Sequence, residues 1–247
     1  MANGIYAAAA GLAAQQDRID AISNDLANAG TTGYRSERVG FEDLLYGSSE
    51  QGVPVGAGAR SLDAGRSGVQ GALAASTNPL ALAIVGPGYF QVKRQDGSTA
   101  LTRDGDLQID ASGSLVTSNG EQLVPPIKLP AGTQPADVTI ASDGTVSVST
   151  SGSAAAPATV GKIALVDVPA ENGLLALGAN DYAATTASGA VAAAQGAKLV
   201  QGQLEGSDVD VASAMTSLLD AQQSYSLISH AIQTQDQLLQ IANELRQ

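Results

Sequence analysis

Residues that could perform catalysis are few in this sequence, and their spacing does not assemble a recognisable active site. His230 is the only histidine, and no Cys, Asp or Glu stands three or four positions away to form a ligand pair. Residues 65–69, Gly-Arg-Ser-Gly-Val, depart from the Gly-x-Ser-x-Gly nucleophile motif at the last position. Residues 86–88, Gly-Pro-Gly, lack the third glycine of a dinucleotide-binding loop, and a P-loop is missing. We therefore predict that the chain is not an enzyme and has no catalytic residue.

Metal and cofactor sites are not expected either. Asp104, Asp106 and Asp110 superficially suggest calcium, but they miss the EF-hand spacing, and Asp104-Gly105 is better explained as a tight turn. The sequence has no Cys, which excludes thiolate ligands, thiolate nucleophiles and disulfides. Absence of Cys suits a protein that crosses compartments, although chance explains it equally well. The predicted sets of cofactors and metals are therefore both empty.

Charge and composition exclude several classes of partner. The 247-residue chain has a formal net charge of -12 and scattered Lys and Arg residues, so no basic stripe could follow a nucleic-acid backbone. Aromatic residues make up 3% of the chain and Trp is absent, so base-stacking platforms are not expected. The N-terminus lacks the basic start of a secretory signal, and no segment reaches the roughly 20 apolar residues of a membrane helix. We expect no nucleic-acid binding, no membrane insertion, and export, if any, by another route.

The elements that must position any functional side chain begin with two long helices at the ends of the chain. Small and apolar residues recur there with the 3.5-residue spacing of a coiled-coil seam. In the first helix, expected from near Asn3 to near Ala29, these residues are Ile5, Ala8, Leu12, Ile19, Ile22, Leu26 and Ala29. In the second, expected after Gly206 with Ser207 or Asp208 as its N-cap, they are Val211, Ala214, Leu218, Ala221, Tyr225, Ile228, Ile232, Leu239 and Ala242.

The middle of the chain carries strand and turn patterns. Residues 34–46 mix charged with large apolar side chains and could form a short helix or an extended arm. Residues 47–79 are rich in Gly and Ser and are predicted to be extended or loop-like. From residue 80 onward, short runs alternate apolar with polar residues. The pairs between these runs are typical of hairpin turns: Asp96-Gly97, Asp104-Gly105, Ser112-Gly113, Asn119-Gly120 and Asp143-Gly144.

These patterns predict an α+β fold. The N- and C-terminal helices are expected to pair as a coiled-coil-like axial domain, and the β-rich middle domain to consist of hairpins and meanders. The expected boundaries are the N-terminal helix at 1–33, an extended linker segment at 34–79, the β-rich domain at 80–203 and the C-terminal helix at 204–247. The side chains expected to pack between helices and between subunits are Ile5, Leu12, Ile19, Ile22, Leu26, Leu218, Tyr225, Ile228, Ile232 and Leu239.

Several segments resemble one known family, in the same order along the chain. Residues 22–28, Ile-Ser-Asn-Asp-Leu-Ala-Asn, followed by Thr32-Gly33-Tyr34-Arg35, resemble the N-terminal signature of bacterial flagellar rod and hook proteins. Residues 86–92 and 101–105 resemble core strands of that family, and residues 201–211 resemble the segment that opens its C-terminal helix. The motif residues matched near the N-terminus are Asn24, Leu26, Asn28, Thr32, Gly33 and Tyr34.

Within this family, the length and residues 41–46 are most similar to distal rod proteins of the flagellar basal body. The resemblance implies a structural subunit that polymerises into a hollow helical drive shaft and transmits torque from motor to hook. It implies contacts with other flagellar rod and hook proteins and with ring proteins around the rod. It also implies a place in the cell envelope outside the cytoplasmic membrane, type III export without a cleavable signal, and terminal helices that stay disordered until assembly.

Other interpretations remain open at this point. The insertion that many distal rod proteins carry after residue 46 is short here, spanning 47–60, so a proximal rod protein or a short hook-like subunit also fits the resemblance. A secreted coiled-coil surface protein would share the two helices but would form lateral sheets or stalks in place of a tube. An enzyme would need a deep pocket with convergent polar groups.

Overall fold

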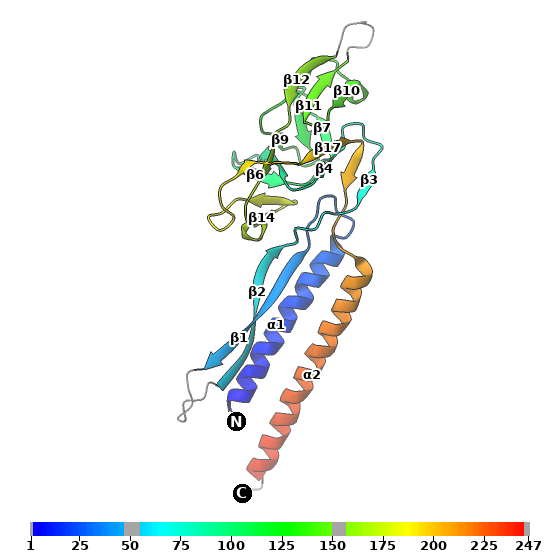
Figure 1. Cartoon of the computed structure of the whole chain (residues 1–247). Helices are drawn as coiled ribbons and strands as arrows, with labels where there is room; N and C mark the ends of the chain where they lie inside the picture. Colours follow the sequence, from blue (N-terminus) through cyan, green and yellow to red (C-terminus); the bar gives the residue numbers. More distant parts are fainter. Residues whose placement is uncertain (1, 47–54, 150–156, 245–247) are drawn as a thin grey trace. The chain divides into compact units, whose positions relative to one another are not determined.

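Figure 1 shows the protein as a computed structural model, which describes residues 2–46, 55–149 and 157–244. The chain divides into two compact units. The helical unit comprises the residues up to 27, residues 37–65 and those from 210 onward. The strand unit comprises residues 28–36 and 66–209.

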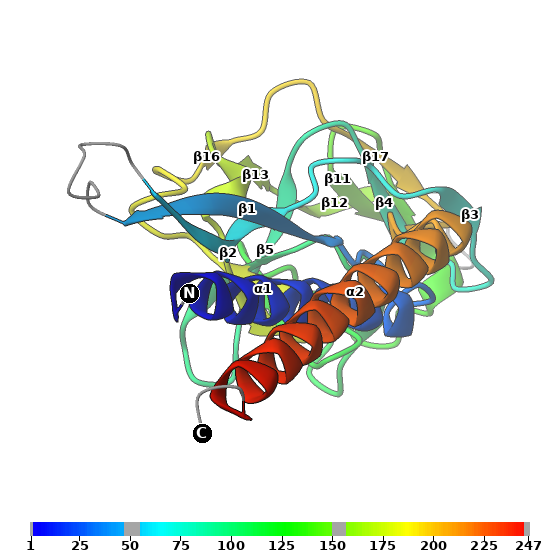
Figure 2. The ribbon, with the colours of Figure 1, turned by 90° about the horizontal axis from the view of Figure 1, so that it is seen from below.

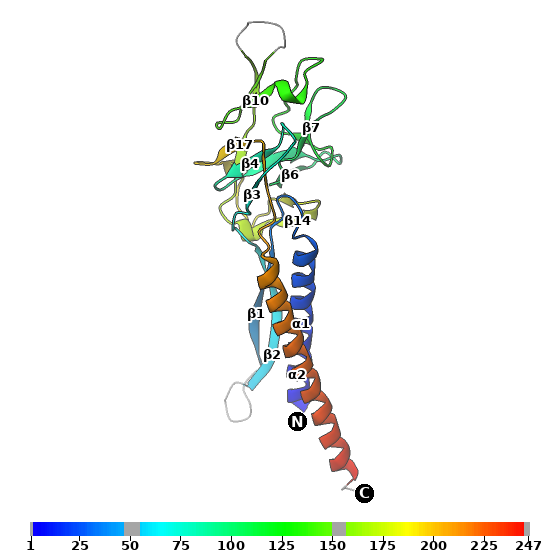
Figure 3. The same cartoon turned by 90° about the vertical axis from the view of Figure 1, so that its right-hand side faces the viewer.

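The helical unit contains two long helices and a pair of strands: α1 (Ala2–Ala27), β1 (Glu37–Tyr46), β2 (Val55–Arg66) and α2 (Val211–Glu244). The two helices lie side by side (Figures 1 and 3). The β1–β2 pair runs along α1 (Figure 2). The long helices predicted for both ends of the chain are therefore present. In the part of the chain that the structure describes, no helix combines the length and hydropathy needed to span a membrane.

α2 begins at Val211 because Asp210 caps it. Ser213 N donates to Asp210 Oδ1 at 2.9 Å, and a carboxylate at this position also suits the positive end of the helix dipole. The prediction that Ser207 or Asp208 caps this helix is wrong. The Asp208 carboxylate instead accepts hydrogen bonds from Ser36 N and Ser36 Oγ, at 2.7 and 3.1 Å.

The segment for which the sequence allowed a short helix or an extended arm forms strand β1 from Glu37 onward. β2 pairs with β1 although its sequence is rich in Gly and Ala. These small residues let the strand approach α1 closely. Gly58 has φ +98°, and a Cβ there would lie 2.6 Å from the Ala7 carbonyl oxygen. Residues 47–54, which belong to the predicted insertion, lie outside the described residues.

The strand unit is built from short strands and two short 3₁₀ helices. In chain order they are β3 (Leu73–Ala75), β4 (Leu82–Val85), β5 (Tyr89–Lys93), β6 (Thr99–Thr102), β7 (Leu107–Ile109), β8 (Leu115–Thr117), β9 (Gln122–Leu123), η1 (Pro135–Asp137), β10 (Val138–Ile140), β11 (Thr145–Val148), β12 (Ala158–Lys162), β13 (Leu165–Asp167), η2 (Glu171–Gly173), β14 (Leu175–Gly178), β15 (Asp181–Ala183), β16 (Ala192–Ala193), β17 (Lys198–Gln201) and β18 (Gln203–Glu205).

Within the described residues, the largest sheet has the order β14-β15-β6-β5-β9-β8-β7, with β13 pairing to β5 and β16 to β13. A smaller sheet has the order β10-β11-β12. Two long-range pairs, β17 with β4 and β18 with β3, join the end of the strand unit to its beginning (Figure 3). Together with the terminal helices, this strand-rich middle gives an α+β fold.

Large apolar side chains fill the interior of the strand unit. One cluster centres on Leu82, Phe90 and Leu107, each with no exposed surface. A second cluster contains Tyr89, Leu101, Val166, Val168, Leu174 and Tyr182. Tyr89 and Tyr182 meet edge to face, with ring centroids 6.2 Å apart. The strand unit therefore has a dense core of its own.

Most of the predicted hairpin glycines have the positive φ that such turns require. Gly97, Gly113, Gly120 and Gly144 have φ values of +84°, +80°, +81° and +89°. The prediction of a tight turn at Asp104-Gly105 is wrong, because residues 103–106 form no turn. A glycine is needed there for another reason, since a side chain at Gly105 would collide with the Leu82 carbonyl oxygen.

Candidate functional site

The contact between the two helices is lined by small residues. Ala221 of α2 is buried, and a Cβ built on Gly4 of α1 would lie 3.5 Å from Gln235 Nε2 of α2. A Cβ built on Gly11 would lie 3.7 Å from Ile228 Cδ1, which is an ordinary van der Waals contact. Small side chains let two helix backbones approach closely, but they remove little apolar surface from water. The seam within one chain is therefore narrow.

The larger side chains predicted to pack along this seam are not fully buried. Half-buried positions are Ile5, Leu12, Ile19, Ile22, Leu26, Leu218, Ile228 and Ile232. Tyr225 is 38% exposed, and the side chain of Leu239 lies outside the described residues. Their packing against neighbouring subunits therefore stays a prediction, and each half-buried side chain retains surface that a neighbour could cover.

α2 carries a second apolar surface that the chain itself leaves open. Among the described side chains of this helix, Ala221 alone is buried. Val211, Met215 and Leu219 follow one another at four-residue steps, and Leu227 continues the same ridge two steps later. The large aliphatic side chains of this helix that are exposed among the described residues, which we call the α2 ridge, are Val211, Met215, Leu219, Leu227, Leu238 and Ile241. Contiguous exposed apolar surface marks an interaction site.

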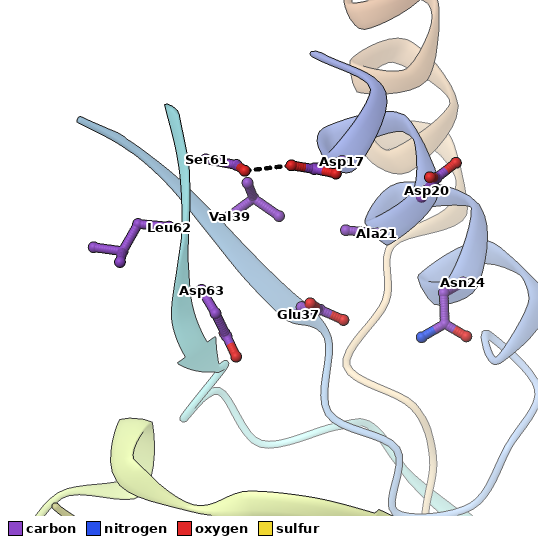
Figure 4. Close-up of a pocket in the computed structure, with 9 residues that line it drawn as sticks. All are labelled: Asp17, Asp20, Ala21, Asn24, Glu37, Val39, Ser61, Leu62 and Asp63. Atoms are coloured by element: carbon purple, nitrogen blue, oxygen red, sulfur yellow. Dashed lines mark hydrogen bonds between the residues drawn. The ribbon is translucent and has the colours of Figure 1, made fainter. Parts of the chain in front are cut away.

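A polar groove of about 390 Å³ lies on the other side of α1, between that helix and the β1–β2 pair (Figure 4). Its α1 side presents Asp17, Asp20 and Asn24, and its strand side presents Glu37 and Asp63. The Asp17 carboxylate accepts a hydrogen bond from the Ser61 hydroxyl. Across the described residues, no group of three or more His, Cys, Asp or Glu side chains is arranged to hold a metal ion. The groove therefore gives no sign of metal chemistry.

Three sequence segments that are far apart in the chain meet inside the strand unit, at a place that we call the motif junction. The segments are 33–36, 103–105 and 205–208. Gly33 has φ +67°, and a Cβ there would lie 2.8 Å from the Arg103 carbonyl carbon. Gly33 N donates to the Glu205 carbonyl oxygen at 2.8 Å. The glycine of the N-terminal motif is thus required both by its backbone conformation and by close approach to Arg103.

A buried ionic cluster holds the motif junction together. Arg35 Nη2 lies 2.9 Å from Glu205 Oε1, and Arg103 Nη1 lies 3.1 Å from Glu205 Oε2. The side chains of Arg35 and Glu205 are each 1% exposed and that of Arg103 is 2% exposed. Gly71 N also donates to Glu205 Oε1 at 3.1 Å, and Arg103 Nη2 donates to the Gly86 carbonyl oxygen at 3.0 Å. One carboxylate therefore serves three donors from three parts of the chain.

A second buried ionic group lies between β15 and the β8–β9 hairpin. Arg94 Nε is 3.4 Å from Glu121 Oε1 and 3.5 Å from Asp181 Oδ2, and both carboxylates are buried. Burial raises the pKa of Asp181 to about 7, and the adjacent Glu121 carboxyl adds to this effect. One arginine thus faces two carboxylates, and a proton at Asp181 relieves their repulsion near neutral pH.

The residues of the predicted N-terminal motif divide between the two units. Asn24 lines the groove, and Leu26 is half-buried on α1. Asn28 accepts a hydrogen bond from Thr31 Oγ1 at 3.3 Å. The Thr32 carbonyl oxygen accepts one from Asn180 Nδ2 at 2.9 Å. Gly33 and Tyr34 are buried in the motif junction.

Sequence reasoning did not single out Arg35, Arg103 and Glu205, although all three lie inside the segments that resemble the rod and hook family. Each of these segments also contains other polar residues, such as Asp104 and Asp208, so the local sequence does not mark these three as buried.

Comparisons with known protein families cover most of the chain. Residues 5–35 match the family described as "Flagella basal body rod protein". Residues 83–148 match "Flagellar hook protein FlgE/F/G D1 domain", and residues 200–245 match "Flagellar basal body rod FlgEFG protein C-terminal". The first and third matches cover most of α1 and α2, and the second lies in the strand unit.

Individual relatives align along nearly the whole chain. The chain is 37% identical over 258 residues to the flagellar basal-body rod protein FlgG of Caulobacter vibrioides, covering 97% of each chain. It is 37% identical over 265 residues to the FlgG of Borreliella burgdorferi, covering 100% of this chain and 99% of the relative. It is 35% identical over 263 residues to the FlgG of Buchnera aphidicola subsp. Schizaphis graminum, covering 99% of this chain and 100% of the relative.

Proposed function

This chain belongs to the flagellar basal-body rod protein family, and we propose that it is the distal rod subunit, which polymerises into a hollow helical shaft carrying torque from motor to hook. Members of this family are structural components of the flagellum and not enzymes. The observation that carries the proposal is the α2 ridge, whose large apolar side chains stay exposed in a single copy.

The α2 ridge supports assembly through many copies. Full burial of a Leu or Met side chain contributes roughly 1.5–3 kcal/mol, so six half-exposed side chains contribute on the order of 5–9 kcal/mol. Association of two proteins costs an estimated 4–15 kcal/mol in lost freedom of motion. A single contact of this kind is therefore marginal, and we infer that each subunit meets several neighbours at once.

The two sides of α2 suit different partners. Its Ala221 side packs on α1 of the same chain, and its ridge is open to a neighbouring copy. A neighbour that covers the ridge with a different part of its own surface makes a head-to-tail contact, and such contacts continue into a helical polymer when they do not close. In this proposal α1 and α2 form a coiled-coil-like axial domain that lines the channel, with the strand unit on the outside.

The proposed mechanism is mechanical. Helices bundled along the axis resist bending and torsion, because their backbone hydrogen bonds and packed seams deform little. We propose that the shaft contacts other flagellar rod and hook proteins at its ends and ring proteins around its length. Export before assembly would deliver the chain with its terminal helices disordered, and burial of the α2 ridge would then order them.

The proposal is tested by charged substitutions in the helix seam. Ile232→Asp and Leu12→Asp place a carboxylate where an apolar side chain is half-buried, and we expect both variants to build no rods while the strand unit stays folded. Gln233→Asp adds the same charge at the next, exposed position of α2 and serves as the matched control. Electron microscopy of basal bodies from complemented cells, with circular dichroism of each purified chain, measures both outcomes. Normal rods from Ile232→Asp would rule out the seam as an assembly surface.

Assignment to the distal segment needs a separate test, because a proximal rod protein has similar elements. Antibody labelling of purified basal bodies locates the subunit along the shaft. Label next to the hook is the expected result. Label confined to the end near the motor would transfer the assignment to the proximal rod.

A further inference from the structure

The motif junction suggests a role for the Arg35–Glu205–Arg103 cluster beyond membership in a folded core. We propose that this cluster is a latch that fixes the two chain segments leading to the terminal helices at defined places on the strand unit. Its members are Arg35, shortly before β1, Arg103, directly after β6, and Glu205, the last residue of β18. Breaking the latch should free those segments without unfolding the sheets.

Two of the latch segments adjoin places where the chain leaves the strand unit. The segment 33–36 lies between α1 and β1 in the sequence, and the segment 205–208 lies just before α2. Both belong to the strand unit, and they lie next to two of the four places where the chain passes between the units, after residue 36 and after residue 209; the other two are after residues 27 and 65. A subunit that must present its helices reproducibly to neighbours needs those points to be fixed.

The two segments are joined to each other by several hydrogen bonds. Glu205 accepts from Arg35 through its side chain and from Gly33 N through its carbonyl oxygen. Asp208 accepts from Ser36 N and Ser36 Oγ, and Asp208 N donates to the Tyr34 carbonyl oxygen at 3.3 Å. Each segment therefore loses several hydrogen bonds when the other leaves.

The charges of the cluster depend on one another. Two guanidinium groups share one carboxylate in a site that excludes water, so the Glu205 charge is needed to keep both arginines buried. Arg103 is further held by its position 5.1 Å from the Tyr89 ring centroid, which belongs to the second apolar cluster. When one partner of a buried ion pair is removed, the other is left as an uncompensated buried charge. Glu205 is therefore the residue on which the latch depends.

Backbone packing shows how little room the junction has. A side chain at Gly71 would collide with the Gly206 carbonyl oxygen, and Gly206 N donates to the Ala72 carbonyl oxygen at 2.8 Å. β18 and β3 pair in register at this place, with Glu205 opposite Leu73. The backbone on both sides of Glu205 is therefore packed closely against the segment that contains Gly71.

The exposed pair Arg60–Glu42 provides a matched comparison within the same chain. Arg60 Nη2 and Nε donate to Glu42 Oε2 at 2.8 and 3.0 Å, but both side chains are more than half exposed. Surface ion pairs contribute little to stability because water screens them. Neutralising Glu42 removes the same formal charge as neutralising Glu205 without uncovering a buried cation.

Hydrogen exchange measured by mass spectrometry on the unassembled full-length protein tests the latch. For Glu205→Gln we expect amides in residues 28–36 and 203–209 to exchange at least tenfold faster, while β4, β5 and β6 exchange at the wild-type rate. Glu42→Gln should leave both regions unchanged. Unaltered exchange at 28–36 in Glu205→Gln would overturn the proposal, and so would equal acceleration across the sheets, because the cluster would then serve only global stability.

A second variant covers the possibility that Glu205→Gln does not fold. Arg35→Lys keeps the buried charge but removes the planar fork that reaches Glu205. We expect faster exchange at 28–36 and 203–209, smaller than in Glu205→Gln, with the core strands unchanged. No change in Arg35→Lys, or a change spread evenly over the strand unit, contradicts the latch.

The mechanical use of the latch rests on the proposed rod function, in which part of the torque between the helices and the strand unit crosses these segments. Cells carrying Arg35→Lys should build rods but swim more slowly under viscous load. Exchange on the unassembled chain tests the latch by itself. Wild-type chains that never form rods would count against the rod proposal and leave the latch result intact.

Discussion

The strand unit and the helical unit bury their side chains in opposite ways. The strand unit encloses large apolar residues such as Phe90 and Leu82, which have no exposed surface. The described apolar side chains buried in the helical unit are all alanines, namely Ala14, Ala21, Ala57 and Ala221. Large apolar residues of α2, among them Leu227 at 71% exposed, face outward. The difference supports the proposal that the strand unit is stable by its own packing and that the helical unit completes its packing against neighbouring subunits.

The largest effect expected from this comparison is in the core of the strand unit. Phe90→Ala should lower the free energy of unfolding by about 3–5 kcal/mol, because it removes a fully buried ring and leaves a cavity. Leu227→Ala on α2 should change the same quantity by less than about 0.5 kcal/mol in the unassembled chain. Urea unfolding followed by circular dichroism measures both. Similar losses in the two variants would contradict the proposed difference between the units.

The next effect appears only on assembly. We expect Leu227→Asp to leave the unassembled chain as stable as the wild type, because the side chain is exposed there. In the polymer the variant places a charge on the α2 ridge, so the critical concentration for polymerisation should rise at least tenfold. This rise corresponds to about 1.4 kcal/mol of association free energy per subunit. Gln233→Asp should leave the critical concentration within about twofold. Sedimentation of assembled material across a concentration series gives both values. An unchanged critical concentration in Leu227→Asp would show that the ridge stays exposed in the rod.

A smaller effect concerns pH and the strand unit alone. The pKa of Asp181 is raised to about 7 in the folded chain, so folding favours its protonated form. Protonated Asp181 therefore adds to the free energy of unfolding. This contribution is fully present at pH values below the ordinary carboxyl pKa of about 4, and it is lost as the pH rises toward 7. Asp181→Asn cannot ionise, and its amide can donate to Glu121 Oε2, which has no hydrogen-bond partner among the described residues.

Asp181→Asn should therefore stabilise the strand unit at pH 8 by on the order of 1 kcal/mol and by less at pH 5. Urea unfolding of wild type and variant at the two pH values gives the difference directly. Other titrating groups are common to both chains and cancel in that comparison. A gain of equal size at both pH values would mean that ionisation of Asp181 does not weaken the fold.

The parts of the fold that could be predicted from sequence depend on local rules. Apolar periodicity indicated both terminal helices, because residues one turn apart share a face whatever the rest of the chain does. Asp96-Gly97 and Asn119-Gly120 indicated hairpins, because the positive φ of the glycine is a property of the turn itself. Asp104-Gly105 has the same local pattern but forms no turn. Its glycine is required by the close approach of the distant Leu82 backbone.

The parts that could not be predicted depend on residues far apart in the chain. Strand β2 has a Gly- and Ala-rich sequence with little strand preference, and its pairing with β1 and its approach to α1 stabilise it. Arg35, Arg103 and Glu205 are separated by about 70 and 100 residues, and nothing in their local sequence shows that they are buried together. The N-terminal motif could be recognised by its resemblance to the family. The reason why the motif needs residues such as Gly33 could be found only in the structure.

In the proposed rod, the terminal helices complete their packing only in the assembled shaft. Hydrogen exchange across residues 211–244 can be compared between the unassembled full-length chain and sedimented polymer. We expect fast exchange in the unassembled chain and at least hundredfold slower exchange in the polymer, equivalent to about 2.7 kcal/mol or more of added protection. Full protection of α2 in a chain that stays monomeric at high concentration would show that the helices need no neighbours.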